Sequence, residues 1–454
     1  MGVLPDPSPP YLPRHVPAAL SGAYPARPGN FVRPLVDGVP AFRRIAAAIA
    51  AARHSVWLTV AFYADDFRFP DNAGTLFDVL DRAAARGLDV RALFWRPNAE
   101  SAHYGRAFAG TPADLARLRD CSARFSIRWD QAHAAFCQHQ KSWLIDAGRP
   151  GETAFVGGIN LTAMALGSPG HRDGGRHDLY VEVAGPSATD VRHNFVQRWN
   201  EASEREKPDG IWGPHGKSAL AFPTRASEPR GASLVQIQRT VHPGRYTDST
   251  AAPNASRHDI SAGERSCLEQ YERAIEAARS SIYIENQALP IPSLARKLDS
   301  ALRRGVEVVL LVPAEPETAV RDLTRATVES LAPYDNFTLA GLILSEATAR
   351  RAVYVHAKTM LVDDAWATIG SCNLHANSLT GNTEMNASIW DAELTRALRC
   401  ELLAEHLGRD TSGLDDRSAL RLFRALADAN RKNHSAGQPT CQGNAVRLAP
   451  GDYG

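Results

Sequence analysis

Two copies of one short motif, His-x-Lys-x4-Asp, are the residues of this chain whose types and spacing could do chemistry together. With 15 His in 454 residues and only six Lys, about 0.01 chance matches to this spacing are expected. Each copy is followed by a turn of small residues that ends in Asn. The two sets are His139, Lys141, Asp146 and Asn160, and His356, Lys358, Asp363 and Asn373.

These side chains match what displacement at a phosphodiester requires. The substrate group is negatively charged and has a poor leaving group, so it needs cations on its free oxygens, a nucleophile, and an acid for the departing alkoxide. Two imidazoles, two ammonium groups and two Asn amides supply this set without a metal ion. We therefore expect Lys141, Lys358, Asn160 and Asn373 to hold the phosphate.

A metal cluster is the alternative interpretation of the first motif, because His133 and Cys137 precede His139. Their spacing matches no standard zinc site. We expect no metal and no cofactor.

The two histidines need different protonation states. An imidazole nucleophile must be neutral, whereas the imidazole that protonates the leaving group must carry a proton. Each ring also needs a carboxylate that fixes its tautomer. The candidates are Asp178 and Glu384, which lie on the strand-like segments after the two Asn residues.

The motif Asp residues are expected to act differently from the motif His and Lys. Alternation along a strand places the His and Lys of each motif on one face and the Asp on the other. We therefore expect Asp146 and Asp363 to be structural, bracing backbone or a neighbouring strand without touching the substrate.

The elements that position these residues occur twice, in the same order. In each half, two helix–strand units precede the motif, and a further strand and helix follow it. Such alternation predicts an α/β fold, and a repeat of this length indicates duplicated domains. The matching segments are 42–63, 76–95 and 177–200 in the first half, and 271–287, 294–313 and 383–408 in the second.

The predicted domain boundaries follow from this repeat and from the composition between its copies. We expect a Pro-rich segment at 1–30, a first lobe with a linker loop at 31–232, and a second lobe at 233–410. A C-terminal helix and a flexible tail are expected at 411–454, where loop-forming residues are frequent.

Composition excludes several classes of protein. The net charge of +1 provides no field that would recruit nucleic acid. The six Cys are scattered, which is typical of reduced thiols. Neither a signal peptide nor a transmembrane run is visible. We expect a cytoplasmic monomer that contacts a membrane surface peripherally.

From about residue 30 to residue 410 the sequence resembles the phospholipase D superfamily. The resemblance rests on the two motifs and on residues 181–200 and 281–287. It implies two homologous lobes, each a mixed β-sheet flanked by helices, related by a pseudo-twofold axis with the active site at their interface. One departure is Asn377-Ser378, which stands where the second motif of the family often continues to Arg-Ser.

The resemblance also implies roles for individual residues. His139 would be the nucleophile that forms a phosphohistidine, and His356 the general acid and then the base. The phosphate-binding residues would be Lys141, Lys358, Asn160 and Asn373, and the residues that orient the histidines would be Asp178 and Glu384.

The leading functional expectation is a phospholipase D that hydrolyses the head-group phosphodiester of glycerophospholipids, with transfer to an alcohol also open. The alternatives with the same chemistry are a phosphatidyltransferase of the cardiolipin synthase kind and a nuclease or nucleic-acid phosphodiesterase. A nuclease would need a basic track, which the charge balance does not favour. An inactive lipid-binding relative is disfavoured because both motifs are intact. The expected partner is a phospholipid at a membrane surface, with no stable nucleic acid.

Overall fold

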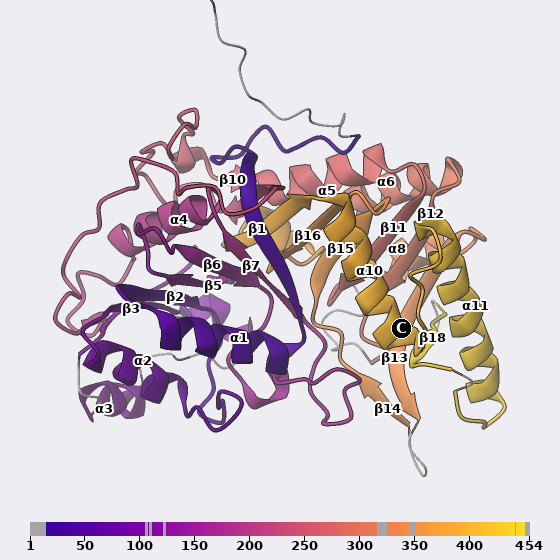
Figure 1. Ribbon diagram of the computed structural model, residues 1–454, viewed down its shortest axis with the longest axis horizontal. Helices are drawn as coiled ribbons and strands as arrows, with labels where there is room; N and C mark the ends of the chain where they lie inside the picture. Colours follow the sequence, from indigo (N-terminus) through magenta and orange to yellow (C-terminus); the bar gives the residue numbers. More distant parts are fainter. Residues whose placement is uncertain are drawn as a thin grey trace, which may run out of the picture.

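The chain forms two similar halves, each built on one large β-sheet, as the computed structural model shows (Figure 1). Figure 1 draws the first half in indigo to magenta on the left and most of the second in orange to yellow on the right. The structure describes residues 15–104, 108, 111–120, 124–315, 325–345, 350–440 and 442–449. Residues 1–14 of the predicted Pro-rich segment 1–30 lie outside these residues.

The first sheet has three parallel strands at its centre and antiparallel neighbours on both sides. β2, β3 and β4 are parallel, whereas β5, β6, β7, β1 and β8 pair antiparallel with their neighbours. The order across the sheet is β1 (Arg27–Val36), β7 (Leu179–Ala184), β6 (Thr153–Gly157), β5 (Lys141–Ile145), β2 (Ser55–Val60), β3 (Asp89–Trp95), β4 (Ser126–Asp130) and β8 (Ile211–Trp212).

The second sheet repeats this order and these strand directions, with two short strands at its far edge and β10 (Glu264–Arg265) beside β9. The repeat confirms the predicted duplication and the mixed sheets. Across this sheet the strands are β9 (Ser233–Val241), β17 (Glu384–Trp390), β16 (Trp366–Gly370), β15 (Lys358–Val362), β11 (Ser281–Asn286), β12 (Glu307–Leu311), β13 (Phe337–Ser345), and then β14 (Arg350–Val353) and β18 (Ala445–Arg447).

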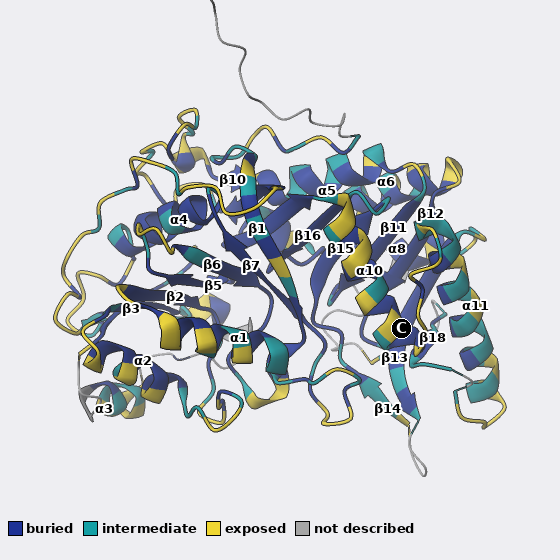
Figure 2. Cartoon of the chain, viewed as in Figure 1, coloured by how far each residue is buried: buried dark blue, intermediate teal, exposed yellow. Residues whose placement is uncertain are grey.

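Helices cover both faces of each sheet, and they turn their buried sides inward (Figure 2). In the first half, α1 (Gly38–Ala51) and α2 (Leu76–Ala85) share an apolar cluster with one face, and α4 (Ala188–Asn200) packs on the other. In the second half, α5 (Ser266–Ala277) and α6 (Pro292–Arg303) cover one face, and α10 (Ala392–Leu407) and α11 (Asp416–Ser435) the other. The shorter helices are α3 (Pro112–Asp120), α8 (Arg325–Leu331) and α9 (Ala376–Thr380). Among the described residues, no helix combines the length and apolar character needed to cross a bilayer.

The two halves share one hydrophobic core. A single cluster of buried residues contains Val156 and Val181 of the first sheet together with Ala367 and Ile369 of the second. Strand β1 also belongs to both sheets, because its first residues pair with β9 and residues 31–36 pair with β7. The motifs therefore lie in a single packed unit.

The C-terminal residues differ from the prediction of a flexible tail. Residues 445–447 form β18, which pairs antiparallel with β13. Ala445 and Val446 are buried, and Asn430 of α11 donates to the Ala445 carbonyl (2.8 Å). The prediction is wrong for this strand because loop-forming residues around it conceal a short apolar stretch that completes the sheet edge.

Each motif Asp binds the backbone of the turn that leads into the neighbouring strand. The Asp146 carboxylate accepts from the N–H groups of residues 53–55, the closest at 2.6 Å. Asp363 accepts in the same way from residues 279–281, with distances of 2.8–2.9 Å. Both Asp residues adopt a positive φ, 53° and 56°, which directs the side chain back toward this turn. These contacts provide an acceptor for the N–H groups that precede and begin β2 and β11.

Replacing Asp146 or Asp363 with Ala should lower the melting temperature, because several backbone donors would lose their acceptor. Each substitution should reduce the free energy of unfolding by about 1–3 kcal/mol. Thermal denaturation measures this, with Asp410→Ala as the control, since Asp410 is exposed and, among the described residues, accepts hydrogen bonds from Ser412 alone. A wild-type melting temperature in the Asp146 and Asp363 variants would contradict the bracing role.

Candidate active site

The two motifs meet between the halves of the chain. Each motif histidine donates its backbone N–H to a carbonyl of the other half. The N–H of His139 donates to the carbonyl of Thr383 (2.9 Å), the residue before Glu384. The N–H of His356 donates to the carbonyl of His177 (2.8 Å), the residue before Asp178. Each histidine is therefore fixed by the strand that carries the carboxylate of the other half.

The side chains repeat this crossing. His139 Nδ1 donates to Glu384 Oε2 at 2.8 Å, and His356 Nδ1 donates to Asp178 Oδ2 at 2.6 Å. All four side chains are buried. Because a proton on Nδ1 is held by a carboxylate, Nε2 of each ring carries the lone pair that could attack or accept a proton.

The surroundings of the first pair favour an ionised carboxylate. Burial alone would raise the pKa of Glu384, but its electrostatic interaction and hydrogen bond with His139, together with Lys141 and Ser371, hold it below its ordinary value. The hydroxyl groups of Ser371 and Ser378 each donate to this carboxylate at 2.6 Å. The pKa of His139 is also lowered, chiefly by burial, which keeps the free imidazole neutral.

The second pair has fewer donors. Asp178 accepts from His356 and from the N–H of Leu179 (2.8 Å), and burial raises its pKa to about 7. Burial, with the neighbouring Lys358 and Arg176, lowers the pKa of His356 well below its ordinary value. The two dyads are therefore alike in geometry and different in electrostatics.

The two motif lysines are buried and oriented by their own motifs. Lys141 Nζ donates to the His139 carbonyl (2.7 Å), and Lys358 Nζ donates to the His356 carbonyl and to Gln287 Oε1 (3.2 Å). Burial lowers the pKa of Lys141 to about 8 and that of Lys358 to about 7. A bound anion would favour the charged form of both.

The two predicted Asn residues occupy equivalent turns after β6 and β16. The Oδ1 atoms of Asn160 and Asn373 are buried and make no hydrogen bond within the described part of the chain. A small cavity beside the first of them is lined by Lys141, Phe62 and Thr59. The buried ammonium groups beside these turns are suited to an anion, and the Nδ2 groups of the two Asn amides are the atoms that could donate to it.

The sequence analysis did not identify the side chains that surround the dyads. The hydroxyl groups of Ser371 and Ser378 donate to Glu384. Ser378 belongs to the Asn377-Ser378 pair that differs from the Arg-Ser often found in the family, and it therefore has a contact within the site. Gln287 contacts Lys358 and also Tyr354 (3.0 Å). Ser371 lies in the small-residue turn before Asn373, which is the signal that could have pointed to it.

The cysteines near the site are not nucleophiles. Burial, with Glu384 close by, raises the pKa of Cys137 well above its ordinary value, and burial does the same for Cys372. His133, weighed above with Cys137 as a metal ligand, stacks on His242 with ring centroids 3.7 Å apart.

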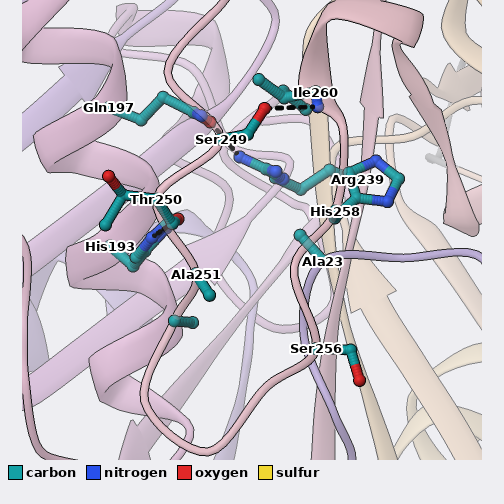
Figure 3. A pocket seen from close by; sticks show the side chains of 11 residues that line it. Ala23, His193, Gln197, Arg239, Ser249, Thr250, Ala251, Ser256, His258 and Ile260 are labelled. Carbon is teal, nitrogen blue, oxygen red and sulfur yellow. Dashed lines mark hydrogen bonds between the residues drawn. The ribbon is translucent and has the colours of Figure 1, made fainter.

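A second small pocket lies outside the motif site, between α4 and an irregular loop. Figure 3 shows His193 and Gln197 of α4 facing the irregular segment that includes Ser249 and Thr250. His193 Nε2 contacts the Thr250 carbonyl at 2.8 Å, and Gln197 accepts from Arg239 at 2.7 Å. None of the motif residues lines this pocket. Its polar groups bind one another and hold the loop against α4.

Comparison with known proteins identifies the family and supports the duplicated arrangement. The family described as "Cardiolipin synthase, PLD-like domain" matches residues 45–199 and 271–405, which are the two halves. A cardiolipin synthase of Listeria monocytogenes is 25% identical over 390 residues, covering 83% of this chain and 69% of that protein. Phospholipase D alpha 2 of Oryza sativa is 24% identical over 519 residues, covering 82% and 62%.

One solved structure has the same fold over most of its length. The phosphatidylserine synthase of Haemophilus influenzae aligns with a TM-score of 0.55 and 12% identity, covering 90% of this chain and 95% of that one. The family match, which spans more than half of the residues and repeats once in each half, confirms the resemblance inferred from the two motifs. This chain belongs to the phospholipase D superfamily, in the family described as cardiolipin synthase, PLD-like domain.

Proposed function

We propose that this chain is a phosphatidyltransferase, which moves a phosphatidyl group from one phospholipid to the hydroxyl group of another through a phosphohistidine. The observation that carries the proposal is the crossed arrangement of two His–carboxylate pairs beside two buried lysines. This arrangement provides a nucleophile, an acid and a cationic phosphate site within one buried centre.

In the first step, His139 Nε2 attacks the phosphorus and forms a P–N bond. The bond to the head-group oxygen breaks, and this alkoxide takes a proton from Nε2 of His356. His139 is assigned as nucleophile because Glu384, which Ser371 and Ser378 help to keep ionised, stabilises the positive charge that develops on its ring. The phosphate's own negative charge favours the protonated form of His356 before attack.

In the second step, His356 Nε2 removes the proton from the acceptor hydroxyl group. The acceptor oxygen attacks the phosphorus, the P–N bond breaks, and His139 returns to its neutral form. Lys141 and Lys358 neutralise the non-bridging oxygens in both steps, while Asn160 and Asn373 position these oxygens by donating from Nδ2.

Two observations support transfer over the hydrolysis that the sequence analysis placed first. His139 and His356 are only 7% and 5% exposed, so little water reaches the intermediate. The similar Listeria protein is named a cardiolipin synthase, and the rice phospholipase D is similar over a smaller share of its own length.

Vesicles of phosphatidylglycerol test the proposal. Transfer between two molecules of this lipid gives cardiolipin and glycerol, whereas hydrolysis gives phosphatidic acid and glycerol. We expect cardiolipin from the wild-type chain and neither lipid product from a folded Lys141→Ala chain. Phosphatidic acid without cardiolipin would instead establish a hydrolase. Nicking of supercoiled plasmid, without any lipid product, would indicate a nuclease.

The two histidines should prove unequal with a substrate whose leaving group needs no proton. On a p-nitrophenyl phosphodiester, His356→Ala should keep a burst of nitrophenol and accumulate phosphoenzyme on His139, whereas His139→Ala should show neither. With phospholipid, His356→Ala should lose about 10²–10⁴-fold in rate because the acid is gone. Mass spectrometry of the quenched adduct locates the phosphoryl group; finding it on His356 would reverse the roles.

Anion binding should weaken as the pH rises. The pKa values of about 8 for Lys141 and about 7 for Lys358 mean that both lysines lose their charge between neutral and mildly alkaline pH. Sulfate should therefore raise the melting temperature more at about pH 6 than at about pH 9. Lys358→Met should remove most of that difference. An equal effect of sulfate at both pH values would contradict the lowered pKa values.

A further inference from the structure

A second cluster of ionisable side chains lies outside the phosphate site, next to one of its supports. It brings together residues from two parts of the first half and from α10 of the second, and their ligand atoms lie within 4.8 Å of one another. Its members are Asp37 (between β1 and α1), His171 and His177 (in the segment before β7) and Glu405 (near the end of α10).

We propose that these four residues bind one divalent metal ion, with Zn²⁺ as the best chemical fit, and that this ion joins the two halves of the chain. Two imidazole nitrogens and two carboxylate oxygens form a four-ligand set typical of zinc. The two carboxylates balance the charge of the ion. The ion would not contact the phosphate.

Three of the separations between the ligand atoms are close to those of a tetrahedral site, and all of them lie within 4.8 Å. His171 Nε2 lies 3.0 Å from Glu405 Oε1 and 3.5 Å from Asp37 Oδ1, and His177 Nδ1 lies 3.0 Å from Asp37 Oδ1. Tetrahedral ligands at zinc bond lengths are about 3.3 Å apart. The four atoms are therefore already spaced around a position that an ion could occupy.

The outward-facing nitrogen of each histidine is held as a metal ligand requires. His177 Nε2 donates to Glu285 Oε2 at 2.9 Å, and His171 Nδ1 donates to the Gly175 carbonyl at 3.2 Å. Glu285 is itself supported by Tyr283 (2.7 Å) and His406 (2.9 Å). Carboxylates and carbonyls in these positions fix the tautomer that presents the other nitrogen to a metal.

Without a metal ion, two polar atoms of the cluster have no hydrogen-bond partner among the described residues. A doubly protonated His177 would bridge Asp37 and Glu285, but His171 Nε2 and Asp37 Oδ2 are buried and form no hydrogen bond within the described residues. Both belong to side chains that are at least nine-tenths buried. In the described part of the chain, the ion pairs of Asp37 and Glu405 are with histidines only. A metal ion would use the lone pair of His171 Nε2 and would balance the charge of the buried Asp37 carboxylate.

The cluster is not repeated at the equivalent position in the other half of the chain. Thr383 holds the place of His177 in the other half, and Thr59 holds that of Glu285, so the equivalent residues there could not form this site. The cluster does reach the active site, since the His177 carbonyl accepts the N–H of His356. An ion here would position this support and tie α10 to the first half.

Metal analysis of the full-length chain tests the proposal. After incubation with Zn²⁺ and removal of the excess, the wild-type chain should retain about one Zn²⁺ per molecule. His171→Gln and Glu405→Gln should lose it. The matched control is His193→Gln, which replaces the buried imidazole of Figure 3 that contacts Tyr24 and the Thr250 carbonyl, and it should retain the ion. Retention by His171→Gln and Glu405→Gln would place the ion elsewhere and overturn the proposal.

The wild-type chain alone also decides the question if the variants do not fold. Loading with Co²⁺ should give the intense visible absorption of a four-coordinate site, and a chelator should abolish it and lower the melting temperature. Absence of stoichiometric binding, or the weak absorption of six-coordinate Co²⁺, would overturn the proposal and identify the cluster as a protonated histidine–carboxylate network. These readouts are independent of lipid transfer, so they do not depend on the proposed function.

Discussion

The catalytic centre depends on two hydrogen bonds that cross between the halves of the chain, from His139 to Glu384 and from His356 to Asp178. Neither half contains a complete pair. A small rotation of one half against the other would separate both histidines from their carboxylates and release both tautomers. Truncating one partner would leave the other buried and uncompensated, which is more costly than the bond itself is worth. The shared core and the strand β1 hold this alignment.

The backbone repeats in the two halves, but the side chains around the two histidines differ. The reaction needs one neutral and one protonated imidazole, yet the duplicated fold offers two equivalent positions. The Glu384 side has serine hydroxyls, and the Asp178 side adjoins the cluster of His177 and Glu285. Because these neighbours lie outside the motifs, one half can differ from the other while the geometry at the phosphorus is retained.

The motif residues and the duplication could be predicted from the sequence because both depend on local spacing. Strand alternation showed which way His139 and Lys141 point, and the repeated helix–strand order predicted the sheets. Alternation does not show which distant segment lies opposite, so the crossing of the pairs could not be predicted. The cluster around His171 was missed for the same reason, since Asp37 and Glu405 are separated by most of the chain. Strand β18 was missed because only three residues pair there, and their burial depends on the sheet edge they meet.

Because β1 pairs with strands of both sheets, it affects how the chain folds during synthesis. During synthesis, this strand leaves the ribosome well before β9, its partner in the second sheet, which begins at Ser233. The carboxylate that completes the His139 pair follows still later, on β17. Until then the nascent first half has an unpaired strand edge and an exposed part of the common core, which is a template for association with other chains. The His139–Glu384 pair therefore cannot form until β17 has been translated, and the second half completes the common core by covering the first.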